Sequence, residues 1–231
     1  RTLEEGGAVY LKDGNDVIIG SSGKDILDGG LGDDYLTGGN NDDELLGNKG
    51  HDVLLGEEGQ DFLDGSSGDD MLSGGKGLDV YIFGYGYGKD TIQENGNHDE
   101  IDTVYFEEGV SLENLWINIK ENSVEIALKD GVKSFENLDD MLTIENAFSL
   151  DDKVELFRFH DDSEVTFEEL TTLPIADNQT IDLKEDTQSL NSLVVNNPLE
   201  KALTYEIINM SDDGDFSINE NGEWEYAPNN N

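Results

Sequence analysis

The chain has 231 residues, enough for one large domain or for about two to three small ones, each with a buried core. Its 54 Asp and Glu against 13 Lys and Arg give a net charge of -41, which excludes nucleic acid as an expected partner, because binding phosphates requires basic side chains. The chain has no cysteine, and this excludes a disulfide framework and thiolate metal sites.

The strong negative charge leaves two possibilities open. Self-repulsion opposes compaction, so the chain is either extended and solvated or folded around cations. No apolar run approaches the roughly 20 residues of a membrane span, and we expect no span. The start, "RTLEEGGAVY", has neither an initiator Met nor a signal-peptide pattern, and the end, "YAPNNN", is abrupt, so we expect a fragment of a longer protein.

Glycine and proline divide the chain into three zones. Of the 27 glycines, 24 lie before residue 110, whereas all three prolines lie after residue 173. Together with the motifs described below, this distribution predicts three domains, at residues 1–92, 93–173 and 174–231.

The first zone repeats with a period of nine residues, in eight consecutive units from Leu11 to Ile82, such as "GGLGDDYLT" and "GEEGQDFLD". The eighth position of every unit is apolar or aromatic, and the sixth position is always Asp. The sixth-position residues are Asp16, Asp25, Asp34, Asp43, Asp52, Asp61, Asp70 and Asp79.

This period predicts a stack of very short strands. The glycine-rich half of each unit tolerates the positive φ of tight turns, and the x-apolar-x triplet is long enough only for a short strand. If two units make one coil, residues 18 apart stack in parallel and bury one column of side chains on each side. The columns are Ile18, Leu36, Leu54 and Leu72 on one side, and Leu27, Leu45, Leu63 and Tyr81 on the other. Four coils at about 4.8 Å spacing make a rod about 19 Å long.

Stacking aligns the aspartates as well, and bare carboxylates at strand spacing repel one another. Lys and Arg are too scarce to separate them. Calcium accepts six to eight carboxylate and carbonyl oxygens in flexible geometry, and glycine turns present carbonyls well. The aspartates are therefore predicted calcium ligands, whereas Asp13, Asp33, Asp42 and Asp69, at other loop positions, are expected to be solvated.

At these residues the sequence resembles the RTX family, whose GGxGxDxUx nonapeptide is a calcium-binding repeat. The resemblance implies an all-β fold with a right-handed parallel β-roll. It also implies that each ion lies between a loop and the loop two units later, which gives about six calcium ions. The ligands it implies are the eight aspartates and carbonyls of the glycine loops, at Gly14, Gly23, Gly29, Gly32, Gly38, Gly47, Gly50, Gly56, Gly59, Gly65, Gly68, Gly74 and Gly77.

Several positions depart from the repeat. Leu11 and Lys12 replace the two glycines of the first unit, as expected of a terminal repeat. Asn41 replaces a fourth-position glycine, and Asn tolerates the left-handed conformation. Upstream, Val9 keeps the apolar register, which suggests a cap. Downstream, "YGYGKDTIQ" restores the spacing after an insertion and makes Asp90 a further candidate ligand.

The second zone, residues 93–173, loses the period and alternates in polarity. The segments "DTVYF", "LWINI", "VEIAL", "LFRFH" and "EVTFEEL" predict strands and hairpins, and Thr166 with Glu169 predicts the capped start of a short helix. The zone resembles the β-rich flank that follows RTX repeats, and by that resemblance it caps the roll. The outward residues Val17, Tyr35, Val53 and Met71 form an apolar side face, which we expect the flank or a neighbouring domain to cover.

The third zone, residues 174–231, contains "SIN" and "EWEY" around a predicted hairpin turn at Asn221 and Gly222. It resembles the start of a cadherin-like, immunoglobulin-like domain of the kind repeated in large bacterial surface proteins. With fewer than 60 residues present, it would be a partial β-sandwich.

Catalytic motifs are absent from the sequence. The three histidines are far apart without HExxH, "GYGYGK" is not followed by Ser or Thr, and no G-x-S-x-G occurs, so we expect no enzyme. "DDGDFSINENGE" does not match the register of an EF-hand loop. A regular outward row of Thr or Asn, as in ice-binding solenoids, is also missing.

The resemblance implies a secreted or cell-surface bacterial RTX adhesin that folds on binding calcium after type I secretion. Its partners would be calcium ions, neighbouring domains of the same chain and, through other domains, a host-cell or surface ligand. The alternative is the calcium-dependent folding module of a secreted toxin or hydrolase with its active domain upstream. The cadherin-like resemblance of the third zone favours the adhesin.

Overall fold

The computed structural model describes residues 1–94, 101–130, 137–149 and 154–172 in full. Beyond them it describes the main chain of five strands, at 175–176, 189–192, 195–196, 214–218 and 223–228. The chain divides into two compact units, Arg1–Thr171 and Thr172–Asn231. In these parts of the chain the helical residues are only the α-helix Phe167–Thr171, the 3-10 turn Leu112–Asn114 and Asn137, so the fold is all-β. None of the helices described is long and apolar enough to cross a membrane.

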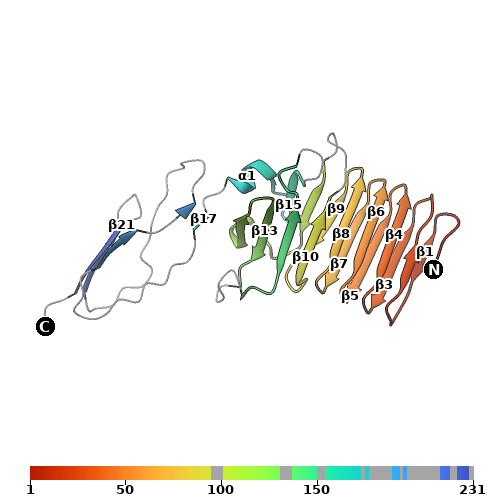
Figure 1. Ribbon diagram of the computed structural model, residues 1–231, viewed down its shortest axis with the longest axis horizontal. Helices are drawn as coiled ribbons and strands as arrows, with labels where there is room; N and C mark the ends of the chain where they lie inside the picture. The colour runs from red at the N-terminus through yellow and green to blue at the C-terminus, as the bar shows by residue number, and fades with distance from the viewer. Residues whose placement is uncertain are drawn as a thin grey trace. The chain divides into compact units, whose positions relative to one another are not determined.

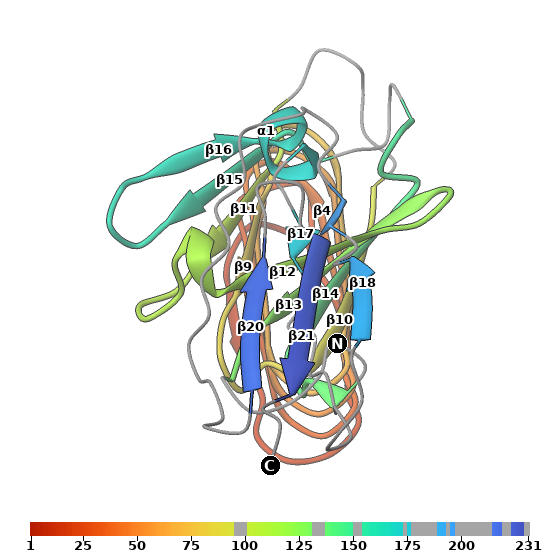
Figure 2. The ribbon, with the colours of Figure 1, turned by 90° about the vertical axis from the view of Figure 1, so that its left-hand side faces the viewer.

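Two sheets of stacked parallel strands build most of the first unit (Figure 1). One sheet contains β1 (Ala8–Tyr10), β3 (Ile26–Leu31), β5 (Glu44–Lys49), β7 (Phe62–Ser67) and β9 (Val80–Phe83). The other contains β2 (Val17–Ile19), β4 (Tyr35–Asn40), β6 (Val53–Glu58), β8 (Met71–Lys76) and β10 (Lys89–Gln93). The chain alternates between the sheets, and successive coils superpose when the unit is viewed end-on (Figure 2).

The register confirms that residues 18 apart stack. Ile18 pairs with Leu36, Leu36 with Leu54, and Leu54 with Leu72, and the column continues to Ile92. The opposite column runs from Val9 through Leu27, Leu45, Leu63 and Tyr81 to Val104. All of these side chains are buried. Because each Leu or Ile buried in this way contributes about 1.5–3 kcal/mol, the two columns are the hydrophobic core of the roll.

The strands are longer than the sequence predicts. Strands β3 to β8 have six residues each, because the pairing continues into the start of the next nonapeptide. At its second position, Gly30 pairs with Asn48 and Gly39 pairs with Glu57. The residue at the second position of these nonapeptides has a positive φ. It is Gly in some loops and Asn48, Glu57 or Ser66 in others.

The flank continues both sheets. β11 (Thr103–Phe106) pairs in parallel with β9 and with β15 (Leu156–Phe159), and β14 (Met141–Glu145) pairs in parallel with β10. Antiparallel hairpins then add β12 (Leu115–Ile119), β13 (Ser123–Leu128) and β16 (Glu164–Thr166), after a 3-10 turn at Leu112–Asn114. All predicted flank strands are present, and β14 is an addition.

The flank residues that the structure describes leave the apolar side face exposed, so the expectation that the flank covers it is wrong, and coverage by a neighbouring domain stays a prediction. Val17, Tyr35 and Met71 are 53%, 40% and 40% exposed. The physical reason is that flank strands extend the sheets at their edge by main-chain pairing, which leaves the outer faces open.

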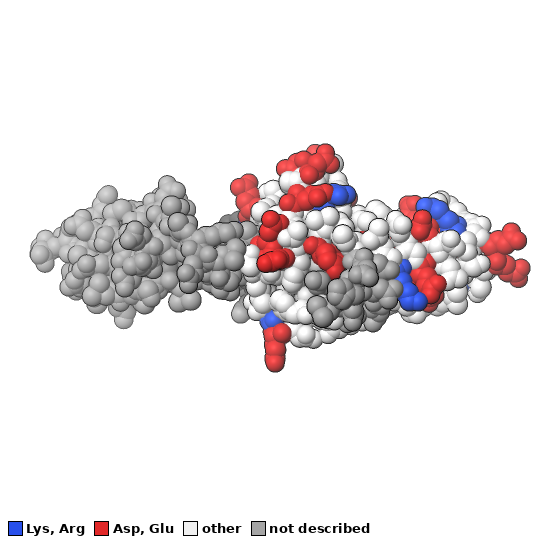
Figure 3. Space-filling model, turned by 90° about the horizontal axis from the view of Figure 1, so that it is seen from above, with Lys and Arg blue, Asp and Glu red and all other residues white. Residues whose placement is uncertain are grey.

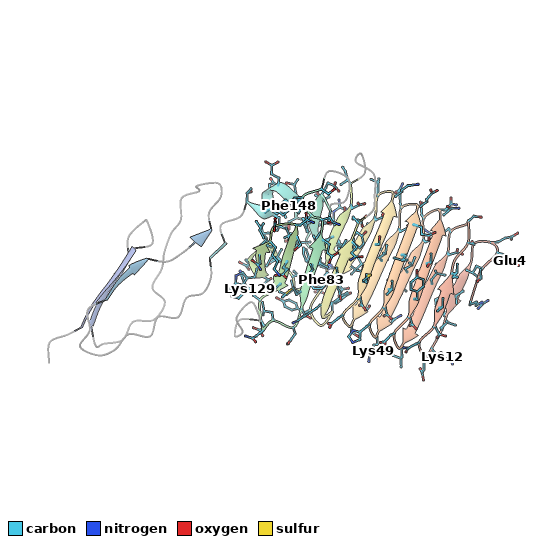
Figure 4. All side chains as sticks on the ribbon, in the orientation of Figure 1. Glu4, Lys12, Lys49, Phe83, Lys129 and Phe148 are labelled. Carbon is cyan, nitrogen blue, oxygen red and sulfur yellow. The ribbon has the colours of Figure 1, made fainter. Side chains whose placement is uncertain are left out.

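Aromatic side chains fill the interior where the repeats end. Phe83, labelled in Figure 4, contacts Tyr87 and Phe106 edge to face, and Phe106 stacks on Phe157 and Phe159. Phe83, Phe106 and Phe159 are register partners two residues beyond the Leu column, and the column itself continues through Tyr81, Val104 and Phe157, so the interior gains a layer of aromatic side chains here.

The short helix α1 (Phe167–Thr171) begins with the predicted capping box. Thr166 Oγ1 accepts the main-chain N–H of Glu169 at 3.2 Å, and Glu169 Oε2 accepts the main-chain N–H of Thr166 at 2.9 Å.

The strands described in the second unit form two small antiparallel sheets. β17 (Ile175–Ala176) pairs with β19 (Val195–Asn196), and β21 (Glu223–Pro228) lies between β18 (Ser189–Ser192) and β20 (Gly214–Ile218). The predicted turn at Asn221 and Gly222 lies outside the described residues, and the immunoglobulin-like sandwich stays a prediction.

Candidate metal centre

The sixth-position aspartates form two ladders through the roll. In each ladder the main-chain N–H of one Asp donates to Oδ1 of the Asp one coil later, over 2.7 to 3.0 Å. One ladder contains Asp16, Asp34, Asp52, Asp70 and Asp90, and the other contains Asp25, Asp43, Asp61, Asp79 and Asp102. Gly7 begins the second ladder by donating its N–H to Asp25 Oδ1 at 2.7 Å.

The second oxygen of six ladder carboxylates is buried without a hydrogen-bond partner. This holds for Oδ2 of Asp34, Asp43, Asp52, Asp61, Asp70 and Asp90. The six side chains are at most 3% exposed, so water does not hydrate these oxygens. The acidic side chains on the visible face of the repeat region lie in separate groups, some beside Lys or Arg (Figure 3). An unpartnered buried carboxylate oxygen is unfavourable unless a proton or a cation compensates it.

First-position glycines make room for these oxygens. A Cβ on Gly56 would clash with Asp61 Oδ2 of the same loop, and a Cβ on Gly47 would meet Asp52 Oδ2 at 2.5 Å. The same holds for Gly29, Gly38, Gly65 and Gly74 against the Asp five residues later.

Fourth-position glycines bring main-chain carbonyls close to the neighbouring coil. A Cβ on Gly32 would lie 2.5 Å from the carbonyl oxygen of Gly14, and at Gly50, Gly59, Gly68 and Gly77 it would clash with the corresponding carbonyl one coil earlier. These glycines also have positive φ, as does Gly14. Asn41 has φ 73°, which confirms that it replaces glycine in the left-handed conformation. Gly23 differs, because it has no positive φ and lies against the Gly6 main chain.

Burial raises the pKa of the ladder carboxylates. It raises the pKa of Asp43 and Asp70 to about 7 and that of Asp52 and Asp61 to about 6. At Asp90 burial raises the pKa to about 8. In each case the hydrogen bond from the N–H of the preceding Asp lowers the pKa, but by less than burial raises it. This hydrogen bond alone therefore does not stabilise the ionised carboxylate.

The residues fit a hard divalent cation. Unpartnered carboxylate oxygens lie beside loops whose carbonyls approach one another, and oxygen-only sites of this kind suit calcium. No three acidic or histidine side chains converge as a cluster within the described ranges, so ions in the roll need main-chain oxygens beside the aspartates.

The two N-terminal aspartates are less suited than the rest. Asp16 is half-buried, in keeping with an atypical first unit. Oδ2 of Asp25 accepts the main-chain N–H of Ser21 at 2.6 Å and its hydroxyl at 3.0 Å.

Asp90 continues the first ladder by accepting the N–H of Asp70 at 3.0 Å.

Three acidic residues that the repeat pattern missed lie where the ladders leave the repeats. Asp102 follows Asp79 in the second ladder after 23 residues, and its own N–H donates to Glu155 Oε2 at 2.9 Å. Glu94 is buried beside Gly74. The segment "IDTVYF" keeps the Asp-x-apolar-x pattern and could have revealed Asp102, whereas no local signal marks Glu94 or Glu155.

The fifth-position residues form an outer ladder. Asn15, Asp33, His51 and Asp69 each accept the N–H of the next coil through a side-chain atom. On the other side Asp42 accepts the N–H of Gln60 at 3.0 Å. Asp13, Asp33, Asp42 and Asp69 are exposed, as expected, so their carboxylates are hydrated.

Comparison with known proteins identifies the repeat. A family model for the RTX calcium-binding nonapeptide repeat, with four copies, matches residues 10–45 and again residues 46–81. These stretches therefore contain RTX calcium-binding repeats, which indicate a calcium-binding structural module. The solution structure of the AlgE6R3 subunit from the Azotobacter vinelandii mannuronan C5-epimerase is similar at 21% identity and a TM-score of 0.37, over 67% of this chain and 92% of that chain. No curated protein matches the chain significantly.

Proposed function

We propose that the chain is a calcium-dependent folding module, in which the ladder aspartates and the loop carbonyls hold the ions. The row of buried carboxylate oxygens without partners carries the proposal. Without a cation the ladders bring like charges together in a chain of net charge -41, and the extended state is favoured.

The ligand groups come from different coils, so the sites do not exist in the unfolded chain. The binding free energy of the ions therefore becomes folding free energy. Extracellular calcium modules have dissociation constants of about 10⁻⁴ to 10⁻³ M, which matches folding after export. The two ladders contain eight successive Asp pairs, two more than the repeats alone provide, because Asp90 and Asp102 each add one.

In this proposal the module belongs to a large secreted or cell-surface adhesin that leaves the cell unfolded through a type I secretion system. The cadherin-like resemblance of residues 174–231 supports the adhesin context. The coding sequence on both sides tests it: further domains like residues 174–231 downstream support an adhesin, and a catalytic domain upstream contradicts it.

The decisive experiment is a calcium titration of the chelated full chain, followed by far-ultraviolet circular dichroism with magnesium as the control cation. We expect a cooperative gain of β-structure near millimolar calcium and no gain with magnesium. Full β-structure that responds to neither calcium nor chelator contradicts calcium-driven folding.

A further inference from the structure

Glu94 occupies a place where the preceding coils have glycine. It directly follows β10, and the pairing of Ile92 with Leu72 aligns it with Gly74. Glu94 is 2% exposed, and its Oε1 accepts the main-chain N–H of Gly74 at 3.3 Å. Its Oε2 is buried without a hydrogen-bond partner.

Two further buried carboxylates lie around the same loop. Asp79 closes the loop that begins at Gly74, and its Oδ2 lies against Gly74. The main-chain N–H of Asp79 donates to Oδ1 of Asp102 at 2.9 Å. Asp79 and Asp102 are 0% and 4% exposed.

We propose that Glu94 is a ligand of a divalent cation that also binds Asp79 and Asp102, where the repeats meet the flank. Three buried carboxylates of like charge need a positive counter-charge to be ionised together, and a hard cation binds through such oxygens. Among the described residues no three acidic side chains converge into a group that could hold an ion alone, so binding at the junction requires main-chain oxygens beside these carboxylates. The inference rests on the proposed calcium function and adds a site that the repeat pattern does not contain.

This cation would connect three strands at the junction. Asp79 precedes β9, Glu94 follows β10 and Asp102 precedes β11, so the ion ties the last repeat to the first flank strand across both sheets. Affinity for calcium increases with the number of charged ligands. The junction ion is therefore bound more tightly than ions that have only the two ladder aspartates.

The test counts ions in the full chain. Calcium bound per molecule is measured by equilibrium dialysis and atomic emission for wild type, E94Q and the control E125Q. Glu125 lies on β13 and bonds Asn118, so E125Q removes the same charge away from the junction. We expect E94Q to bind one calcium ion fewer than wild type, with loss of the tightest class of sites in calorimetry, and E125Q to bind the same number.

An unchanged ion count in E94Q overturns the inference while leaving the proposed function intact, and shows that Glu94 is compensated by a proton. Absence of bound calcium in wild type instead contradicts the proposed function itself. If E94Q does not fold at saturating calcium, E94G decides between the outcomes, because glycine is the residue that the earlier loops have at this position.

Discussion

The main-chain N–H of Asp52 donates to Oδ1 of Asp70 at 2.7 Å, while Oδ2 of Asp70 is buried without a hydrogen-bond partner. One oxygen of the carboxylate thus fixes the register between coils, and the other remains available for a cation. This division explains why the position requires Asp: Asn supplies the first oxygen but replaces the second with an amide, and Glu is one methylene longer. The relationship recurs along both ladders.

Substitution of a ladder aspartate should weaken calcium-driven folding. In D61N, Oδ1 still accepts an N–H, but the charged second oxygen is lost, so we expect the calcium midpoint of the circular dichroism transition to rise about 10-fold or more. The matched control is D42N, because Asp42 is exposed and accepts a main-chain N–H in a similar way. Equal midpoints for D61N and D42N would show that the ladder aspartates are not ligands.

Acid should stabilise the calcium-free roll. The pKa values of Asp43 and Asp70 are about 7 in the folded state, and that of Asp90 is about 8, above the ordinary 3.8. The folded state therefore binds more protons at neutral pH. This stabilisation is complete below the ordinary pKa and is lost as the pH rises through 7 to 8.

Urea unfolding in chelator measures this dependence. Between about pH 8 and about pH 5 the unfolding midpoint should increase. With calcium the direction reverses, because protons compete with the ion and affinity decreases in acid. A calcium-free midpoint that decreases steadily from neutral to acid pH would argue against buried, unpaired carboxylates.

Replacement of a first-position glycine by alanine should distort a calcium site. In G56A the new Cβ meets Asp61 Oδ2 and, at 2.6 Å, the carbonyl oxygen of Gly74. Asp61 is buried and the Gly74 carbonyl belongs to the main chain, so neither oxygen can move aside easily. We therefore expect the free energy of unfolding in saturating calcium to decrease by about 1–3 kcal/mol. At Gly7 the nearest atom is 4.0 Å away, so G7A is the control and should be nearly neutral. Equal denaturation midpoints for G56A and wild type would contradict the tight packing of this loop.

Truncation of an interior column should destabilise the roll itself. Leu54 is fully buried between Leu36 and Leu72, and L54A should reduce the free energy of unfolding in saturating calcium by about 2–5 kcal/mol. Leu31 is 46% exposed, so L31A should change stability little. If L31A costs as much as L54A, the assignment of the interior is wrong.

The repeat pattern predicted the core of the roll residue by residue. Ile18, Leu36, Leu54 and Leu72 stack in the order given by a spacing of 18, and the sixth-position aspartates align with them. Prediction succeeds here because identical units contact only their neighbours, so one period fixes every register in the stack. The use of each Asp oxygen was not predictable, since it depends on which N–H the next coil presents.

The sequence by itself determined the period, the two buried columns and the carboxylates that require a counter-charge, because these features follow from local repetition. The tertiary structure alone decided how the stack ends. Asp102 joins its ladder after 23 residues instead of 18, Glu94 enters a glycine position, and β14 pairs with β10 from 52 residues away. Once the period is lost, loop lengths vary, and only long-range main-chain pairing specifies which residues lie side by side.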